Sequence, residues 1–314
     1  MAPLDQALRR YAEQASAAPP AWLLPLAELR AGPDAEADEL WGQPGDEVAM
    51  VRDFVVEGQA GSLRLRVYRP AGEARLAALL WLHGGGWVVG SVESHDHLCR
   101  AIAARTPCCV VSVDYRLAPE HPFPAALDDA WTALRWILGA ADELRIDPSR
   151  IAIGGDSAGG NLAAVTARRA RDDGISLALQ VLAYPVMDAD FETESYRRYE
   201  SGLNLTREKM QWYWSTYLAG ADPVHPDASP LRAVELQGVA PALIQTCEYD
   251  PLCSEGELYA RRVAEAGVAA TLTRYEGTIH GFLRMPGFTH TATRALDEII
   301  AALTVARAVA TSAS

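Results

Sequence analysis

The chain has 314 residues, of which 49% are hydrophobic, so one large domain or two ordinary ones with a substantial core are expected. Its 41 acidic residues outnumber 28 basic ones. The net charge of -13 argues against a nucleic-acid partner, which would need clustered Lys and Arg.

The start of the chain is charged, with Arg9, Arg10 and Glu13 in place of the apolar core of a secretory signal. The apolar run Leu23–Leu26 is too short to cross a bilayer. We therefore expect a cytoplasmic protein without a membrane span. A homodimer is compatible with the sequence, which does not fix the oligomeric state.

Cysteine usage gives no sign of a disulfide framework or a metal site. The chain has 5 cysteines, an odd number, and their spacing is irregular. Without a CxxC pair or a His/Cys cluster, no zinc site is expected. We predict buried free thiols, no metal and no cofactor. The cysteines are Cys99, Cys108, Cys109, Cys247 and Cys253.

The first 48 residues are rich in Ala, Pro and acidic residues. Residues 4–16 have the pattern of an amphipathic helix, whereas Pro33, Pro44 and Gly45 predict a loop over residues 33–48. We predict that residues 1–48 form an N-terminal cap segment, separate from a catalytic domain over residues 49–314.

From residue 50 onward, apolar strands alternate with helical patterns, which predicts an α/β fold with a mostly parallel sheet covered on both faces. The segment Gly58–Ser62 is a hairpin signal, so the sheet should be mixed. Active sites of such sheets lie at the carboxyl ends of the strands. The predicted strands are residues 51–56, 63–67, 76–82, 110–113, 151–153, 177–182, 242–244 and 271–275. The predicted helices are residues 94–105, 126–139, 158–172, 254–267 and 290–308.

Residues 190–220 interrupt this alternation with an insertion that is dense in aromatic side chains. A long insertion after a strand end is typical of a lid or cap. Two interpretations remain open, because the aromatic residues could line a substrate pocket or only pack the insertion onto the body. The aromatic residues include Tyr196, Tyr199, Trp212, Tyr213, Trp214 and Tyr217.

The segment Gly155–Gly159 reads Gly-Asp-Ser-Ala-Gly and lies between a predicted strand and a predicted helix. In that context the G-x-S-x-G pattern indicates a nucleophile elbow, a tight turn that presents Ser157 at the start of a helix. An ordinary glycine-rich turn is the alternative. We assign Ser157 as the nucleophile.

A second glycine-rich segment, His83–Trp87, follows a buried strand. Consecutive glycines leave backbone N–H groups accessible, as the oxyanion of acyl transfer requires. We assign the oxyanion hole to Gly84, Gly85, Gly86 and Ala158, with the last three as the chief donors. His83 is expected to shape the loop rather than to act as a base.

The other two members of a catalytic triad should follow later strands, with the acid before the histidine. Asp250 and His280 meet this condition, and His280 would pass the serine proton to the leaving alcohol. Glu248 is a rival acid, and Asp250 is preferred because it opens the loop, whereas the strand could still extend to Glu248. We also expect five residues to line the substrate pocket: Trp87, Asp156, Trp212, Ile279 and Phe282.

Together these motifs resemble the hormone-sensitive-lipase-like esterases, the bacterial family IV of α/β-hydrolases. The resemblance covers about residues 50–310, and the combination of motifs is highly specific. The matching segments are His83–Trp87, Asp114–Ala125, Gly155–Asn161, Tyr249–Leu252 and Gly277–Phe282.

The resemblance implies a carboxylic-ester hydrolase that uses no cofactor and favours short or medium acyl chains. It also implies a helical cap built from the N-terminal segment and the insertion. Two departures from the family pattern lie beside the triad, at Cys253–Glu255 and at Thr278. They concern loop packing and substrate preference.

Two other functions remain open at this point. An amidase or carbamate hydrolase could use the same triad on a poorer leaving group. Some relatives of this fold bind small hormones without catalysis, but they lack the histidine that is present here as His280. We therefore expect a small ester as the partner.

Overall fold

The computed structural model describes residues 2–58, 61–72 and 74–312 of the chain. Within these residues, eight strands form one sheet in the order β1-β2-β4-β3-β5-β6-β7-β8. The strands β1, β2 and β4 pair antiparallel, and every other pair is parallel. The strands are β1 Met50–Gly58, β2 Gly61–Arg69, β3 Leu76–Leu82, β4 Cys108–Asp114, β5 Ile146–Asp156, β6 Leu179–Ala183, β7 Ala242–Tyr249 and β8 Ala270–Ile279.

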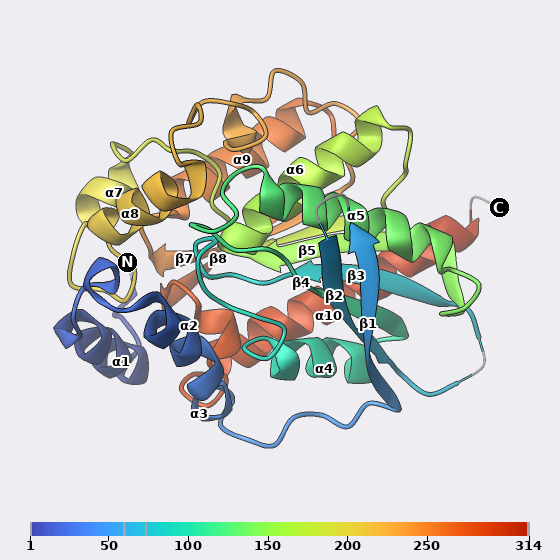
Figure 1. The fold of residues 1–314 in the computed structure, drawn as a ribbon, viewed down its shortest axis with the longest axis horizontal. Helices are drawn as coiled ribbons and strands as arrows, with labels where there is room; N and C mark the ends of the chain where they lie inside the picture. The colour runs from blue at the N-terminus through green and yellow to red at the C-terminus, as the bar shows by residue number, and fades with distance from the viewer. Residues whose placement is uncertain (1, 59–60, 73, 313–314) are drawn as a thin grey trace.

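Helices connect the parallel strands and cover the sheet, which confirms the predicted fold class (Figure 1). All eight predicted strands and all five predicted helices of the catalytic part are present. These helices are α4 Asp96–Arg105, α5 Ala125–Gly139, α6 Ala158–Asp172, α9 Cys253–Glu265 and α10 His290–Ser312.

The alternation of side chains along a strand explains why both faces of the sheet are apolar. On β3, Leu80 and Leu82 join the core that contains α5, α6 and α9. Leu79 and Trp81 face the opposite way and join the core that contains α4 and α10. A central strand buried on both sides therefore reads as a continuous apolar run.

The predicted hairpin joins β1 to β2. Gly58 at the end of β1 pairs with Gly61 at the start of β2. Gln59 and Ala60 of the hairpin signal lie outside the described residues.

The N-terminal segment is more helical than its sequence suggested. The helix predicted over residues 4–16 is present, but the loop predicted over residues 33–48 is wrong for its first part. A helix continues through Pro33, and another follows it. Pro33 lies in the last turns of its helix, where its missing N–H removes only one hydrogen bond. The elements are α1 Gln6–Ala17, η1 Ala21–Leu23, α2 Leu26–Ala35 and α3 Ala37–Trp41.

The insertion forms two helices, α7 Glu194–Arg198 and α8 Arg207–Leu218. Figure 1 shows α1 and α2 beside α7 and α8 on one side of the molecule. The Ser16 hydroxyl at the end of α1 donates to the Leu203 carbonyl at 3.1 Å, so the two segments touch. A short helix, η2 Pro230–Arg232, precedes β7.

All five cysteines are free and buried, as predicted. In the part of the chain that the structure describes, no helix combines the length and the apolar character that crossing a membrane requires.

Candidate active site

The turn between β5 and α6 holds Ser157 in a conformation that side chains rarely adopt, with φ 55° and ψ −120°. The Ser157 N–H donates to the Ala183 carbonyl at 2.9 Å, which fixes the turn to β6. A Cβ atom on Gly159 would collide with the Leu82 carbonyl, so glycine is required where the helix meets β3. This strained turn is the geometry expected of a nucleophile elbow.

Three predicted residues form a hydrogen-bonded series at the carboxyl ends of the strands, with His280 between the other two. His280 Nε2 is 2.9 Å from Ser157 Oγ, and His280 Nδ1 is 2.7 Å from Asp250 Oδ2. Asp250 is fully buried, while Ser157 and His280 are 7% and 9% exposed. A hydroxyl, an imidazole and a carboxylate in this order can activate the hydroxyl as a nucleophile.

The two candidate acids, Asp250 and Glu248, have different hydrogen-bond partners. The other oxygen of Asp250 accepts the Leu252 N–H at 2.9 Å, which orients the carboxylate. Glu248 lies on β7 and accepts the Gly277 N–H at 2.9 Å. Its carboxylate thus holds the segment that leads to His280 and does not meet the imidazole.

Three of the four predicted oxyanion-hole residues have a free backbone donor. Among the described residues, the N–H groups of Gly85, Gly86 and Ala158 have no hydrogen-bond acceptor. Ala158 is the first residue of α6, where an N–H has no partner within the helix. These donors are available to a ligand beside Ser157.

Gly84 and Asp156 differ from their predicted roles. The Gly84 N–H donates to Asp156 Oδ1 at 3.0 Å, so it is already occupied and we remove Gly84 from the set of donors. Asp156 was expected in the substrate pocket, but its buried carboxylate faces Gly84 and His95 behind the loop. The side chain before the nucleophile points back into the protein, because Ser157 occupies the tip of the turn.

His83 packs within the predicted oxyanion loop, His83–Trp87. Its Nδ1 is 2.9 Å from the Gly84 carbonyl oxygen, and its ring stacks on Tyr115 with a centroid distance of 4.1 Å. Tyr115 in turn donates to the His83 carbonyl at 2.7 Å. Burial lowers the pKa of His83 to about 3, so this histidine is neutral.

The remaining pocket candidates lie in two different environments. Trp87, Ile279 and Phe282 are fully buried in the hydrophobic core, so their side chains support the loops that carry the donors and the imidazole. Trp87 stacks on Tyr217 of α8 at 4.1 Å. Trp212 is only half-buried and remains a candidate for the pocket wall.

Two neighbours of the site, Asn204 and Tyr184, were not found from the sequence, whereas a third, Tyr213, is one of the aromatic residues predicted to line the pocket or to pack the insertion. Asn204 donates from Nδ2 to the His280 carbonyl at 2.8 Å. The ring of Tyr184 meets the His280 ring edge-on at 4.9 Å. Tyr213 lies against Gly86, where a Cβ atom would overlap its ring. No motif marks Asn204 or Tyr184, because the contact of Asn204 depends on how the insertion folds and that of Tyr184 on how the end of β6 meets the His280 loop.

The described residues contain no group of three or more His, Cys, Asp or Glu side chains that could hold a metal ion.

The geometry can be compared with known proteins. The family of proteins with the α/β-hydrolase fold matches residues 79–284. The carboxylic ester hydrolase LipN of Mycobacterium tuberculosis is 42% identical over 270 residues, which cover 83% of this chain and 72% of that protein. The ethyl acetate hydrolase of Pseudomonas putida is 40% identical over 275 residues, 85% of this chain and 86% of that protein.

Solved structures of esterases also resemble this chain. An esterase from Pyrobaculum calidifontis superimposes with a TM-score of 0.89 at 40% identity and covers 97% of this chain and 99% of its own. This chain belongs to the hormone-sensitive-lipase-like esterases. The enzyme is therefore a serine hydrolase of the carboxylesterase type. A thermostable esterase from Pseudomonas putida also has the same fold, with a TM-score of 0.91 at 33% identity, and it covers 97% of this chain and 98% of its own.

Proposed function

We propose that this ester hydrolase acts on esters with short or medium acyl chains through Ser157, His280 and Asp250, with an acyl-enzyme intermediate. The observation that carries the proposal is the hydrogen-bonded series from Ser157 Oγ through the imidazole to Asp250. Asp250 orients His280 and stabilises the imidazolium that forms.

The first half of the reaction transfers the acyl group to the enzyme. His280 Nε2 accepts the Ser157 proton as Oγ attacks the carbonyl carbon of the ester. The N–H groups of Gly85, Gly86 and Ala158 donate to the oxyanion of the tetrahedral intermediate. His280 then gives the proton to the leaving alcohol. In the second half, water attacks the acyl group in the same way and releases the acid.

The preference for short or medium acyl chains rests on the cap. We assign the cap to the N-terminal segment, residues 2–48, and the insertion, residues 190–220. Tyr213 of α8 lies directly against Gly86, which limits the space above the donors. One relative is named an ethyl acetate hydrolase, and its ester carries a two-carbon acyl group.

The nucleophile is tested by Ser157→Ala. Turnover of a p-nitrophenyl ester should fall by roughly 10⁴-fold or more, since triad members act as a unit. A phosphonate ester should label the wild-type enzyme at Ser157 alone, as peptide mass analysis would reveal. Ser229→Ala is the matched control, because Ser229 is fully buried and its hydroxyl donates only to the Pro223 carbonyl. The assignment fails if Ser157→Ala keeps more than about a hundredth of wild-type turnover.

Substrate class is tested with matched compounds. Hydrolysis of a p-nitrophenyl ester should exceed that of the corresponding p-nitroanilide by several orders of magnitude, because the amide has the poorer leaving group. Across a series of acyl lengths, kcat/KM should be highest at about four to eight carbons and fall for longer chains. An optimum at sixteen carbons, or comparable rates on the anilide, would contradict this proposal.

A further inference from the structure

A series of hydrogen bonds lies behind the oxyanion loop and involves no triad residue. Asp156 Oδ1 accepts the Gly84 N–H at 3.0 Å and lies 2.9 Å from His95 Nε2. Asp156 is 3% exposed and His95 is 2% exposed, so water contributes little to either group. One carboxylate oxygen thus connects the nucleophile elbow with the oxyanion loop.

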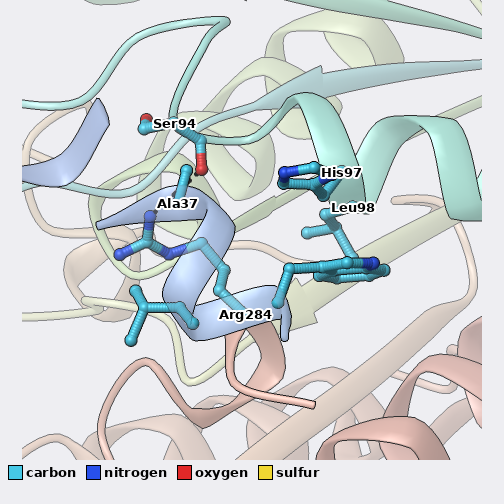
Figure 2. A pocket seen from close by; sticks show the side chains of 7 residues that line it. Ala37, Ser94, His97, Leu98 and Arg284 are labelled. Atoms are coloured by element: carbon cyan, nitrogen blue, oxygen red, sulfur yellow. Dashed lines mark hydrogen bonds between the residues drawn. The ribbon is translucent and has the colours of Figure 1, made fainter. Parts of the chain in front are cut away.

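His95 is itself fixed from two sides. Ser94 Oγ is 2.9 Å from His95 Nδ1, which orients the imidazole. Arg284, in η3 Phe282–Arg284, donates from Nη1 to the Ser94 carbonyl at 3.2 Å. Figure 2 shows Arg284 extending toward Ser94 at the edge of a small cavity that His97 also lines. The loop that carries His280 is therefore linked to the oxyanion loop from behind.

The negative charge of Asp156 does not itself stabilise the oxyanion. Burial alone would raise the pKa of Asp156, but the neighbouring His95 and Arg284 lower it to about 2, so the group is a carboxylate. A fixed negative charge near the hole would oppose the oxyanion rather than stabilise it. Any benefit of Asp156 must come from the geometry that it imposes on Gly84.

We propose that Asp156 and His95 are positioning residues of the oxyanion hole: the carboxylate, held by His95, fixes the peptide N–H of Gly84 so that the next two N–H groups, of Gly85 and Gly86, face the oxyanion. The inference rests on the acyl-transfer mechanism proposed above. Ordered donors cost no reorganisation during the reaction, so loosening this peptide slows turnover without weakening substrate binding.

The decisive variant is Asp156→Ala, which removes the nearer acceptor of the Gly84 N–H, at 3.0 Å, and leaves the more distant His95 Nε2, at 3.4 Å. We expect kcat to fall by roughly 10²–10³-fold, the usual effect of losing one oxyanion donor, with KM changed by less than about threefold. The affinity for a trifluoromethyl ketone, which forms a hemiketal oxyanion with the serine, should fall by a similar factor. The affinity for the product alcohol should stay the same.

Asp156→Asn separates position from charge. Asparagine keeps Oδ1 as an acceptor and removes the negative charge, so this variant should keep turnover within about tenfold of the wild type. Damage equal to that of Asp156→Ala would overturn the positioning role.

The matched control is Asp129→Ala. Asp129 is 4% exposed and accepts the Arg116 N–H at 2.8 Å, so it is a comparable buried carboxylate that does not contact the oxyanion loop. This control should lose stability without changing the ratio of ketone affinity to alcohol affinity. If that ratio moves as far in Asp129→Ala as in Asp156→Ala, the inference is wrong.

If Asp156→Ala does not fold, His95→Phe decides the question, because it keeps a ring and removes the support of the carboxylate. A fall in kcat of about tenfold at constant KM supports the inference, and unchanged kcat overturns it. Failure of the acyl-transfer proposal is recognised separately, because Ser157→Ala would then remain active.

Discussion

The triad loops, which carry Ser157, Asp250 and His280, and the cap differ in the range of the contacts that hold them. Each triad loop is fixed by a hydrogen bond from a backbone N–H group next to a strand end. The Ser157 N–H donates to Ala183 on β6, the Leu252 N–H donates to Asp250, and the Gly277 N–H donates to Glu248 on β7. Such contacts form within a few residues of each strand and leave little freedom in the triad.

The cap is held by contacts between segments that are distant in sequence, which combine packing with hydrogen bonds such as that from the Asp5 N–H to the Gly277 carbonyl at 2.9 Å. Leu8 of α1 and Trp41 of α3 are buried in the core that contains α4 and α10. Tyr217 of α8 stacks on Trp87 beneath it. Packing of this kind tolerates substitution by residues of similar volume. We therefore predict that substitutions in the cap would change the proposed substrate preference and leave the proposed triad in place.

The largest effect on this comparison is expected from deleting residues 1–40. The deletion removes Leu8, Ala12 and Leu40, which are all buried, and so exposes apolar surface beside the site. We expect a lower melting temperature, a loss of activity of about tenfold or more, and a changed ratio of rates on four-carbon and eight-carbon esters. A soluble, truncated enzyme with an unchanged ratio would exclude the N-terminal segment from the substrate pocket.

A point variant tests the same contact more sharply. Arg30 of α2 donates to the Val88 carbonyl at 3.0 Å and to the Ala118 carbonyl at 3.1 Å, and it pairs with Glu120. Arg30→Ala should shift the acyl-length ratio by a few fold, since Val88 follows the oxyanion loop. Glu120→Ala is the control, because it removes the ion pair and leaves both carbonyl contacts. Equal shifts in the two variants would assign the effect to charge.

The sequence was sufficient for the sheet and for the residues that meet at its edge. Apolar runs of strand length and helical periods between them identified every strand of the described sheet, since burial on both faces leaves a clear pattern. Ser157, Asp250 and His280 were found because each follows a strand end, and the fold brings those ends together. The motifs and the expected order of the strands therefore pointed to the same three residues.

The side-chain contacts around the site could not be predicted from the sequence to the same extent. The direction in which Asp156 points depends on the backbone angles of Ser157, which a motif does not reveal. The helices near Pro33 were missed because local propensity is overridden by burial of Leu40 and Trp41. The contact of Asn204 with His280 depends on an insertion without a period of its own.

A variant at Tyr184 tests the place where the two regions meet. Tyr184 and Leu8 belong to the same core, and the Tyr184 ring packs edge-on against His280 at 4.9 Å. The hydroxyl has no hydrogen-bond partner among the described residues. Tyr184→Leu should lower kcat by about tenfold because the imidazole loses a lateral support, whereas Tyr184→Phe should stay within about twofold. Comparable losses in both variants would show that the hydroxyl, not the ring, is needed.

The smallest effect on turnover, and one confined to stability, is expected at Glu255. This residue lies in the first turn of α9 and is 1% exposed. Glu255 Oε1 accepts the Met187 N–H at 2.7 Å, while Oε2 has no partner among the described residues. Burial raises the pKa of Glu255 well above its ordinary value of 4.5, and the nearby Asp188 and Asp250 raise it further. The first turn of α9 thus carries a carboxyl group that keeps its proton to a higher pH in the folded state than in the unfolded state.

The sign of the pH effect follows from proton binding. Below about pH 4.5 both the folded and the unfolded chain keep the Glu255 proton, so the group does not penalise folding. As the pH rises above this value, the unfolded chain releases the proton and the folded chain retains it. The free energy of unfolding then falls by up to about 1.4 kcal/mol per pH unit, until the pH passes the raised pKa of the folded state.

Glu255→Gln keeps Oε1 as an acceptor and cannot ionise, so it should become more stable than the wild type as the pH increases. Urea unfolding between pH 5 and 8 measures the difference, with Glu276→Gln on the exposed face of β8 as the control for losing one negative charge. Activity at constant pH should change little, because Glu255 does not contact the triad. Parallel stability curves for the wild type and Glu255→Gln would show that Glu255 is ionised in the folded enzyme, which would then tolerate a second buried charge near Asp250.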